Sequence, residues 1–366
     1  MAAGFSLRRF RMERDAMTDV FDHPWLGGLF ADRDTAALWS ADAQLAAMRA
    51  FEAAFSRALG RAGLANQAEA AARAIEEMAV DVDDLRAGTG QDGVVVPRLV
   101  RQMKAAAGNA AGAVHRGATS QDVIDTATAL AMRDTLALID ARLGELADAL
   151  DGLTARFGDR PLMGRTRMQA ATEITVAGRI APWRLPLSEH RARIAQAHPR
   201  IARLQLGGAS GDRADLGDRA DAVAADMAAA LGLESPVRAW HAMRDGVAEF
   251  AGLLSLVSGT LGKMGQDVAL MAQQGLSEIE LTGGGTSSAM AHKQNPVLAE
   301  LLVTLARFNA EQLALIHQAM VHEQERSGAA WALEWMVLPQ MAQATGRALV
   351  AAITLADRVK RIGSPH

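Results

Sequence analysis

The feature that most constrains the fold is the spacing of apolar residues in three long segments. In each one, side chains that are apolar apart from Gln312 recur at alternating intervals of three and four positions. This pattern is typical of helices packed nearly parallel, because it keeps one stripe of each helix turned toward its neighbours. The stripes are Leu136, Ile139, Leu143, Leu146, Leu150 and Leu153; Val247, Phe250, Leu254, Val257, Leu261, Met264, Val268 and Met271; and Leu298, Leu301, Leu305, Phe308, Gln312 and Leu315.

The length of these stripes indicates an all-α bundle. The second stripe covers residues 247–271, which is roughly 37 Å of helix at 1.5 Å per residue. Such a helix buries against several neighbours, and a central bundle shared between subunits is the natural way to cover it. Composition agrees, since half of the chain is hydrophobic while aromatic residues make up only 4%. A helical scaffold without catalytic activity would carry the same stripes.

Composition also excludes several classes of protein. The net charge is −4 and there is no basic stripe, so nucleic acid is not an expected partner. No run of about 18 apolar residues indicates a membrane span. The absence of cysteine excludes disulfides, thiol catalysis and Cys-ligated metals. The basic N-terminus lacks the apolar segment of a secretory signal, and we expect a cytoplasmic protein without metal or cofactor.

The order of patterns along the chain predicts four parts. Residues 1–16 precede a second plausible start at Met17 and are expected to be a disordered extension. Residues 17–112 form an N-terminal helical domain, with helices over 34–62, 66–78 and 98–107 and a loop over the glycine-rich stretch 88–97. Residues 113–345 hold the central long-helix bundle, and 346–366 are a short C-terminal remnant.

The segment HRGATSQDVIDTA, residues 115–127, begins the first long helix. Thr119 followed three residues later by Asp122 matches a capping box, the hydroxyl-and-acid pair that starts many helices. The helix start presents free N–H groups and a positive dipole end, and hydroxyls such as those of Thr119 and Ser120 placed there can hold a carboxylate. An ordinary helix cap is the alternative.

Two further segments carry polar residues between apolar runs. GRTRMQAATEITVAG, residues 164–178, places Thr166, Arg167 and Gln169 together in an expected loop or turn. LTGGGTSSAMAHKQNPVLAELL, residues 281–302, combines a pliable triple glycine with Ser287 and with Lys293. We expect Asn295 to cap the next helix and the following proline to be its first residue. A serine and a lysine near a positive helix end suit an anion and a deprotonated hydroxyl.

In this order, the three segments resemble the three signature regions of the fumarase/aspartase superfamily over about residues 17–340. The resemblance implies homotetramers with a shared helical bundle, in which each active site draws its three regions from different subunits. It implies that Ser287 is the general base that removes a proton next to a carboxylate, and that Lys293 and Asn295 hold the aci-carboxylate that forms. Further substrate-binding residues implied in this way are Thr119, Ser120, Thr166 and Gln169.

Within the superfamily, HEQERSGAAWALEW at 322–335, LQLGGASG at 204–211 and AWHAMRDGVAEFA at 239–251 resemble the branch that interconverts 3-carboxy-cis,cis-muconate and its lactone in aromatic catabolism. This adds Arg326 and His241 as substrate-binding candidates, with a buried structural hydrogen bond as the alternative for His241. Members of this superfamily commonly carry a further helical C-terminal domain, which is expected here to be short or absent.

The adenylosuccinate lyase branch is the main alternative. It usually has histidine where this chain has Arg167, because its amine leaving group needs a proton. A leaving carboxylate, with a pKa near 4, departs without one, and an arginine can steady it by bidentate pairing. Arg167 therefore favours the lactone-forming branch. A helical oligomer without catalytic activity is the second alternative for the whole protein.

Overall fold

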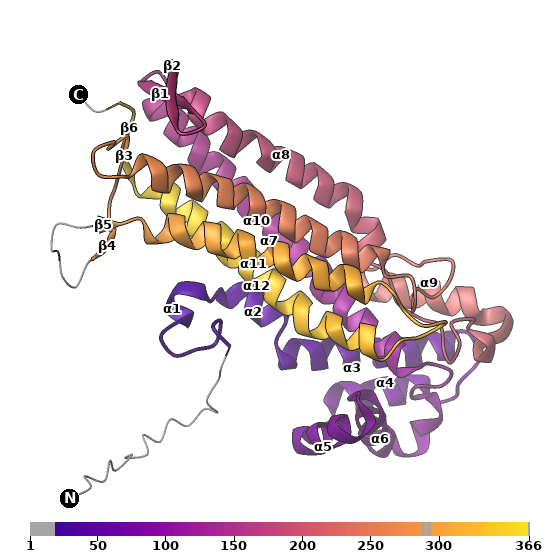
Figure 1. Cartoon of the computed structure of the whole chain (residues 1–366). Coiled ribbons are helices and arrows are strands. Elements are labelled where there is room, and N and C mark those ends of the chain that lie inside the picture. The colour runs from indigo at the N-terminus through magenta and orange to yellow at the C-terminus, as the bar shows by residue number, and fades with distance from the viewer. Residues whose placement is uncertain (1–18, 287–289, 291–293, 365–366) are drawn as a thin grey trace, which may run out of the picture.

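The computed structural model describes residues 19–286, 290 and 294–364, and shows long helices lying side by side (Figure 1). They are α7 (Ser120–Phe157), α8 (Val176–Ile201), α10 (Asp245–Met271), α11 (Val297–Ala319) and α12 (Ala329–Asp357). Every residue of the first two predicted stripes is buried, in α7 and α10 respectively. The predicted all-α bundle is therefore confirmed, and no helix in the described ranges is long and apolar enough to cross a membrane.

The third predicted stripe is out of phase by one residue in its second half. Leu315 is 40% exposed, whereas Ile316 is buried. The buried line of α11 runs through Leu302, Leu305, Asn309, Ile316 and Ala319. The reason is that α11 packs against both α10 and α12, so its buried side is the one between them. Asn309 donates to the hydroxyls of Ser258 on α10 (3.2 Å) and Thr345 on α12 (2.8 Å), which fixes the register of these helices.

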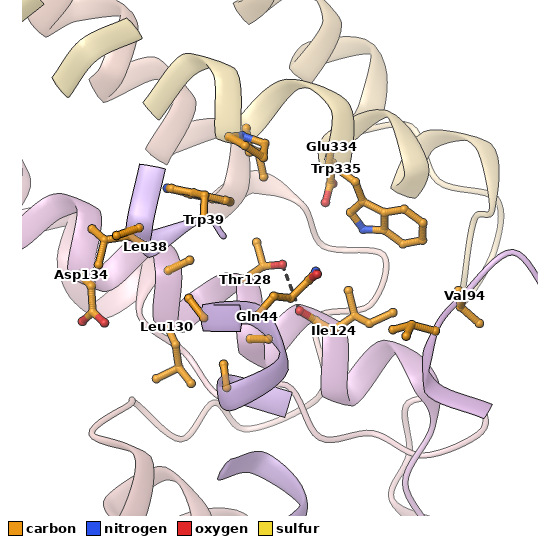
Figure 2. A pocket seen from close by; sticks show the side chains of 18 of the residues that line it. Leu38, Trp39, Gln44, Val94, Ile124, Thr128, Leu130, Asp134, Glu334 and Trp335 are labelled. Atoms are coloured by element: carbon orange, nitrogen blue, oxygen red, sulfur yellow. Dashed lines mark hydrogen bonds between the residues drawn. The ribbon is translucent and has the colours of Figure 1, made fainter. Parts of the chain in front are cut away.

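The N-terminal part holds shorter helices that lie below the bundle (Figure 1). They are α1 (Gly27–Phe30), α2 (Arg33–Leu38), α3 (Ala41–Arg61), α4 (Ala68–Glu77), α5 (Val82–Asp92) and α6 (Val96–Ala107), followed by the 3-10 helix η1 (Gly108–Ala113). The helix predicted over 34–62 is divided at Ser40, whose hydroxyl accepts from the N–H of Ala43 and caps α3. A pocket lies where α2 and α3 meet α7 and α12 (Figure 2).

The loop predicted over 88–97 is wrong for most of its length. Residues 88–92 form the last turns of α5, which ends at Gly93 with φ +72°, and α6 begins at Val96. Gly88 is used for close packing rather than for a turn, because an added Cβ would lie 1.9 Å from Cγ of Arg98.

The domain boundaries expected from sequence can be set beside the helices and the shared cores of the structure. The boundary at 345/346 falls inside α12, which continues to Asp357. Residues of the connection after α8 and of α9 (Ala220–Leu231), among them Leu204, Leu206 and Met227, share a core with the N-terminal helices; the 3-10 helix η2 (Ala214–Arg219) precedes α9. We propose that this segment belongs to the N-terminal unit and that the bundle ends at Asp357. The expected extension over 1–16 lies outside the described residues.

Three small antiparallel pairs lie together at the end of the bundle away from α9 (Figure 1). β1 (Pro161–Thr166) pairs with β2 (Gln169–Thr175), and β3 (Ile279–Leu281) pairs with β6 (Val359–Ile362). β4 (Gly285–Thr286) pairs with β5 (Gln294–Asn295). Two of the three chemically interesting segments are therefore at this end, and the third begins α7 at the other.

Candidate active site

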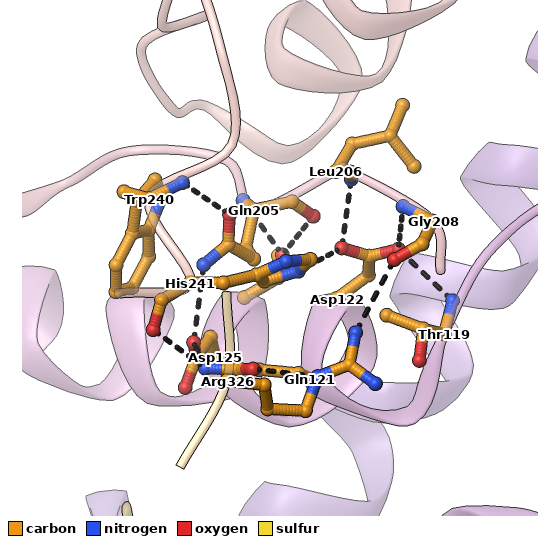
Figure 3. A network of polar contacts seen from close by, with 12 residues as sticks. Thr119, Gln121, Asp122, Asp125, Gln205, Leu206, Gly208, Trp240, His241 and Arg326 are labelled. Atoms are coloured by element: carbon orange, nitrogen blue, oxygen red, sulfur yellow. Dashed lines mark hydrogen bonds and ion pairs between the residues drawn. The ribbon is translucent and has the colours of Figure 1, made fainter. Parts of the chain in front are cut away.

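The start of α7 is held by one buried carboxylate, that of Asp122 (Figure 3). Its Oδ2 accepts the backbone N–H groups of Thr119 and Gly208, both at 2.9 Å, and its Oδ1 accepts the N–H of Gly207 at 2.8 Å. The capping box expected from sequence is present. The same carboxylate also anchors the glycine-rich turn 207–208, and its oxygens are occupied by donors of the protein itself. Asp122 therefore shapes the site rather than binding substrate.

His241 completes the shell of donors around Asp122. Its Nε2 lies 2.8 Å from Oδ1 of Asp122, and the side chain is buried. A carboxylate can only accept, so Nε2 carries the proton. Nδ1 is buried and has no partner among the described residues. Two alternatives were open for His241, a substrate contact and a buried structural hydrogen bond. Its Nε2 makes the structural hydrogen bond.

Arg326 lies across the start of α7 (Figure 3). It belongs to the connection between α11 and α12. Its Nε donates to Oε1 of Gln121 at 3.0 Å, and one terminal nitrogen donates to the carbonyl groups of Gly208 and Ala209 at 3.3 and 3.1 Å. The structure thus brings Arg326 together with Thr119, Ser120 and His241, four of the predicted site residues, and Thr119 and Ser120 remain partly exposed.

A buried ionic network supports this end of the molecule. Arg244 is paired with both oxygens of Asp125 (2.7 and 3.1 Å) and with both oxygens of Glu334 (2.9 and 2.5 Å). Burial raises the pKa of Asp125, but the charge of Arg244 outweighs it and leaves the pKa below its ordinary value. For Glu334, burial dominates and the pKa is raised. No sequence pattern indicates this network, which joins α7, the N-cap of α10 and α12.

His322 lies beside the network without a hydrogen bond from either ring nitrogen among the described residues. Its Nε2 is 3.9 Å from Oε1 of Glu334. Burial, together with the charge of Arg244, lowers its pKa. The lowered pKa therefore favours the neutral ring.

A second histidine–carboxylate pair stands next to the start of α7. Nδ1 of His115 is 2.5 Å from Oε1 of Glu52, and the backbone N–H of His115 donates to Oε2 at 3.1 Å. Glu52 is buried in α3, and His115 has a left-handed φ of +55°. The pairing fixes the imidazole with a proton on Nδ1. Sequence reasoning missed Glu52, which lies 63 positions before its partner.

The second predicted segment, expected to be a loop or turn, is a β-hairpin. Thr166 and Gln169 face each other as the last pair of the β1–β2 ladder. Arg167 and Met168 form the two-residue turn, with φ +49° and +69°. Positive φ at both positions is the turn geometry that matches the twist of paired strands. The hairpin therefore presents the exposed Arg167 at its tip.

In the third segment, the predicted helix start is wrong by one residue. Pro296 occupies the N-cap position and α11 begins at Val297, while Asn295 belongs to β5 and faces Gly285 of β4. The proline ring has no N–H, so Pro296 fits just before the helix as well as in its first turn. The β4–β5 pair brackets Ser287 and Lys293, both of which lie outside the described residues.

The predicted site residues fall into two groups at opposite ends of the bundle (Figure 1). The start of α7, with Arg326, forms one group; the β1–β2 hairpin and Asn295 form the other. The 38 residues of α7 separate them by about 57 Å at 1.5 Å per residue. No single small molecule can contact both groups in one chain. Within the described ranges, no three His, Asp or Glu side chains gather in a way that could hold a metal ion.

Comparison with known proteins finds similarity over nearly the whole chain. Residues 23–309 match the family described as lyase. The 3-carboxy-cis,cis-muconate cycloisomerase of Pseudomonas aeruginosa is 38% identical over 350 residues, which cover 93% of this chain and 76% of that enzyme. The N-acetyl-S-(2-succino)cysteine lyase of Enterococcus italicus is 32% identical and covers 88% and 72%. The structure of the 3-carboxy-cis,cis-muconate lactonizing enzyme from Pseudomonas putida is similar with a TM-score of 0.86 at 36% identity, covering 92% of this chain and 77% of that one.

Proposed function

The chain belongs to the lyase family and has the fumarase/aspartase-type long-helix fold, and from this premise we propose that it is a cytoplasmic enzyme that interconverts 3-carboxy-cis,cis-muconate and its carboxymuconolactone. The observation that carries the proposal is the similarity, in sequence and in fold, to cycloisomerases of that substrate. The polar groups around the start of α7 and at the hairpin tip support it, because arginines and helix N–H groups suit a substrate with three carboxylates.

The chemistry needs a proton transfer next to a carboxylate. In the direction of ring opening, a base removes that proton, the adjacent carboxylate takes up the charge as an aci-carboxylate, and the ring C–O bond breaks to release a carboxylate. Ser287 is the base in this proposal, and Lys293 with Asn295 stabilises the dianion by charge and hydrogen bonding. Arg167 pairs with the departing carboxylate, which needs no proton. Ring closure is the reverse of these steps.

We also propose that the active enzyme is a homotetramer with composite sites. The substrate has a six-carbon chain and is under about 10 Å long at roughly 1.5 Å per bond, whereas the two groups of site residues are separated by the full length of α7. A neighbouring subunit that runs antiparallel along the bundle would bring its hairpin tip to the start of α7. Thr119, Ser120 and Arg326 then come from one subunit, and Thr166, Arg167 and Gln169 come from another.

An ultraviolet assay tests the activity. Purified protein is added to 3-carboxy-cis,cis-muconate and, separately, to adenylosuccinate, and the absorbance of each substrate is followed. We expect only the first to change. Cleavage of adenylosuccinate instead would assign the chain to that branch, and no change with either substrate, from folded and assembled protein, would favour a non-catalytic oligomer.

Mixing two inactive variants tests the composite site. Arg167→Ala and Arg326→Ala each alter an exposed side chain at opposite ends of the bundle. After co-expression, random assembly gives sites with both arginines intact at a frequency of about one quarter (one half times one half), so about a quarter of the normal turnover returns. If each site lay within one chain, no site would regain both arginines and the mixture would remain as inactive as its components.

A further inference from the structure

Gln121, the second residue of α7, is fully buried at the candidate active site (Figure 3). Its side-chain nitrogen Nε2 donates to Oδ2 of Asp125 at 3.1 Å and to the backbone carbonyl of His241 at 3.0 Å. Its Oε1 accepts from Nε of Arg326 at 3.0 Å. Both protons and the oxygen of this amide therefore have partners, and the partners come from three separate segments of the chain.

These partners leave the amide of Gln121 only one orientation. A carboxylate and a backbone carbonyl can only accept hydrogen bonds, so the NH2 group must face Asp125 and His241. The amide oxygen is then turned toward Arg326, whose guanidinium can only donate. Glutamate at this position would place a second buried carboxylate against Asp125, and methionine would offer neither a donor nor a strong acceptor.

Asp125 fixes the position of the Gln121 amide in turn. The carboxylate of Asp125 is buried, and it accepts hydrogen bonds from the side chains of Gln121, Gln205, Arg244 and Trp331. Because these donors approach both oxygens, the carboxylate cannot turn without breaking several bonds at once. The buried ionic network thus reaches the surface of the site through the side chain of Gln121.

Arg326 is the exposed end of this chain of contacts. Besides the bond from its Nε to Gln121, its Nη2 donates to the carbonyl groups of Gly208 and Ala209 at 3.3 and 3.1 Å. Its Nη1 has no hydrogen-bond partner in the part of the chain that the structure describes. The guanidinium is therefore held in one orientation, with one nitrogen left to donate to a carboxylate, and such preorganisation strengthens binding.

We propose that Gln121 is a positioning residue, which holds Arg326 in the orientation that binds a carboxylate of the substrate. Gln121 is buried and its amide is fully engaged, so it acts through Arg326 and not by contact with substrate. This inference rests on the proposed function, in which Arg326 binds substrate, and it adds a residue to that site.

Replacing Gln121 by methionine tests the proposal in the assembled enzyme. Methionine has a similar length and volume but makes none of the three hydrogen bonds. We expect KM for 3-carboxy-cis,cis-muconate to rise roughly three- to tenfold, on the scale of one hydrogen bond. The change in kcat should be less than about twofold, because Arg326 takes part in binding and not in the chemical step.

Gln205→Met is the matched control. Gln205 is equally buried, donates to the same oxygen of Asp125 at 3.1 Å and accepts from the backbone N–H of Trp240 at 2.8 Å. It makes no hydrogen bond with Arg326. The two variants should therefore lower the urea midpoint by similar amounts, whereas Gln205→Met should leave KM within about twofold of its normal value.

A double-mutant cycle shows whether Gln121 acts through Arg326. Arg326→Ala alone should lower kcat/KM on the order of a hundredfold, as for loss of a hydrogen bond to a charged group, and its residual turnover is measured at high enzyme concentration. Adding Gln121→Met to Arg326→Ala should lower kcat/KM by less than about twofold more, because the side chain that Gln121 positions is then absent.

A crystal structure of Gln121→Met gives a readout that does not depend on activity. We expect the guanidinium of Arg326 to leave the place that it occupies beside Gln121. The proposal is wrong if Arg326 keeps that place, if Gln205→Met raises KM as much as Gln121→Met does, or if Gln121→Met has the same effect on kcat/KM with and without Arg326. Failure of the proposed function would appear instead as absence of turnover by the unaltered protein, and the crystal structure would still decide whether Gln121 positions Arg326.

Discussion

Replacing Asp122 by asparagine tests the claim that one carboxylate organises the start of α7. The four donors around it divide evenly, with Gly207 N–H and His241 Nε2 on Oδ1 and the N–H groups of Thr119 and Gly208 on Oδ2. An amide keeps only one accepting oxygen. Placing the amide NH2 group at the Oδ1 position costs the least free energy, because there His241 can move its proton to Nδ1 and accept a hydrogen bond at Nε2.

Even in that orientation, the N–H of Gly207 is left buried against another donor. The hydrogen bonds that remain then go to a neutral acceptor instead of a carboxylate. An unsatisfied buried donor costs about 1–3 kcal/mol, and a hydrogen bond to a charged group contributes about 1.5–3 kcal/mol. We therefore expect Asp122→Asn to lower the free energy of unfolding by about 2–4 kcal/mol.

Urea unfolding followed by circular dichroism, at one fixed protein concentration, measures the loss. Asp148→Asn is the matched control, since it makes the same change on an exposed position of α7 and should alter stability by less than about 0.5 kcal/mol. If Asp122→Asn is as stable as this control, the carboxylate does not organise the site and the reasoning from its four donors is wrong.

Three shorter predictions concern the chemistry and the pH dependence. Ser287→Ala should reduce turnover by roughly 10²–10⁴-fold, as expected for loss of a general base, while Ser288→Ala should be much milder; steady-state kinetics of the two will show whether the assignment is off by one position. Arg167→His should not create adenylosuccinate cleavage, and its appearance in the ultraviolet assay would contradict our choice of branch. Burial lowers the pKa of His190 to about 4, so the folded protein keeps this ring neutral under conditions where the unfolded chain, with a pKa near 6.5, binds a proton. Its contribution to stability is therefore full above about pH 6.5 and is lost as the pH falls toward 4, by up to about 3 kcal/mol; urea midpoints from pH 7.5 to 4.5 should fall more steeply for the native protein than for His190→Gln.

The parts of the fold that could be predicted are those encoded by local periodicity. The stripes of α7 and α10 need only the helix repeat, and the Thr119–Asp122 cap needs only four consecutive residues. The phase of α11 could not be predicted in the same way, because Ile316 rather than Leu315 is buried only when two neighbouring helices are in place. Likewise, Gly88 lies within a helix and against Arg98 of α6, a contact between two helices that the glycine-rich stretch 88–97 does not reveal by itself.

The candidate site, too, could be predicted only where a local sequence pattern encodes it. Thr119 and Ser120 could be proposed because a helix start has a local signature. The ionic network around Arg244 joins it to Asp125 and Glu334, which are 119 and 90 positions away, and no pattern in a single sequence pairs such residues. Ser287 and Lys293 were proposed from resemblance to a family motif, and their roles stay predictions that the variants above will test.

The turn at the hairpin tip has a consequence for attempts to make this protein more resistant to heat. Arg167 and Met168 both occupy left-handed backbone conformations, which cost about 1–2 kcal/mol for each residue that has a side chain. Asparagine followed by glycine suits such a turn far better. A library selected only for heat resistance should therefore drift toward that pair and shed the guanidinium that we assign to substrate binding. Selection for activity should retain the arginine in spite of its strain, so a campaign that seeks both properties should hold position 167 constant and vary position 168.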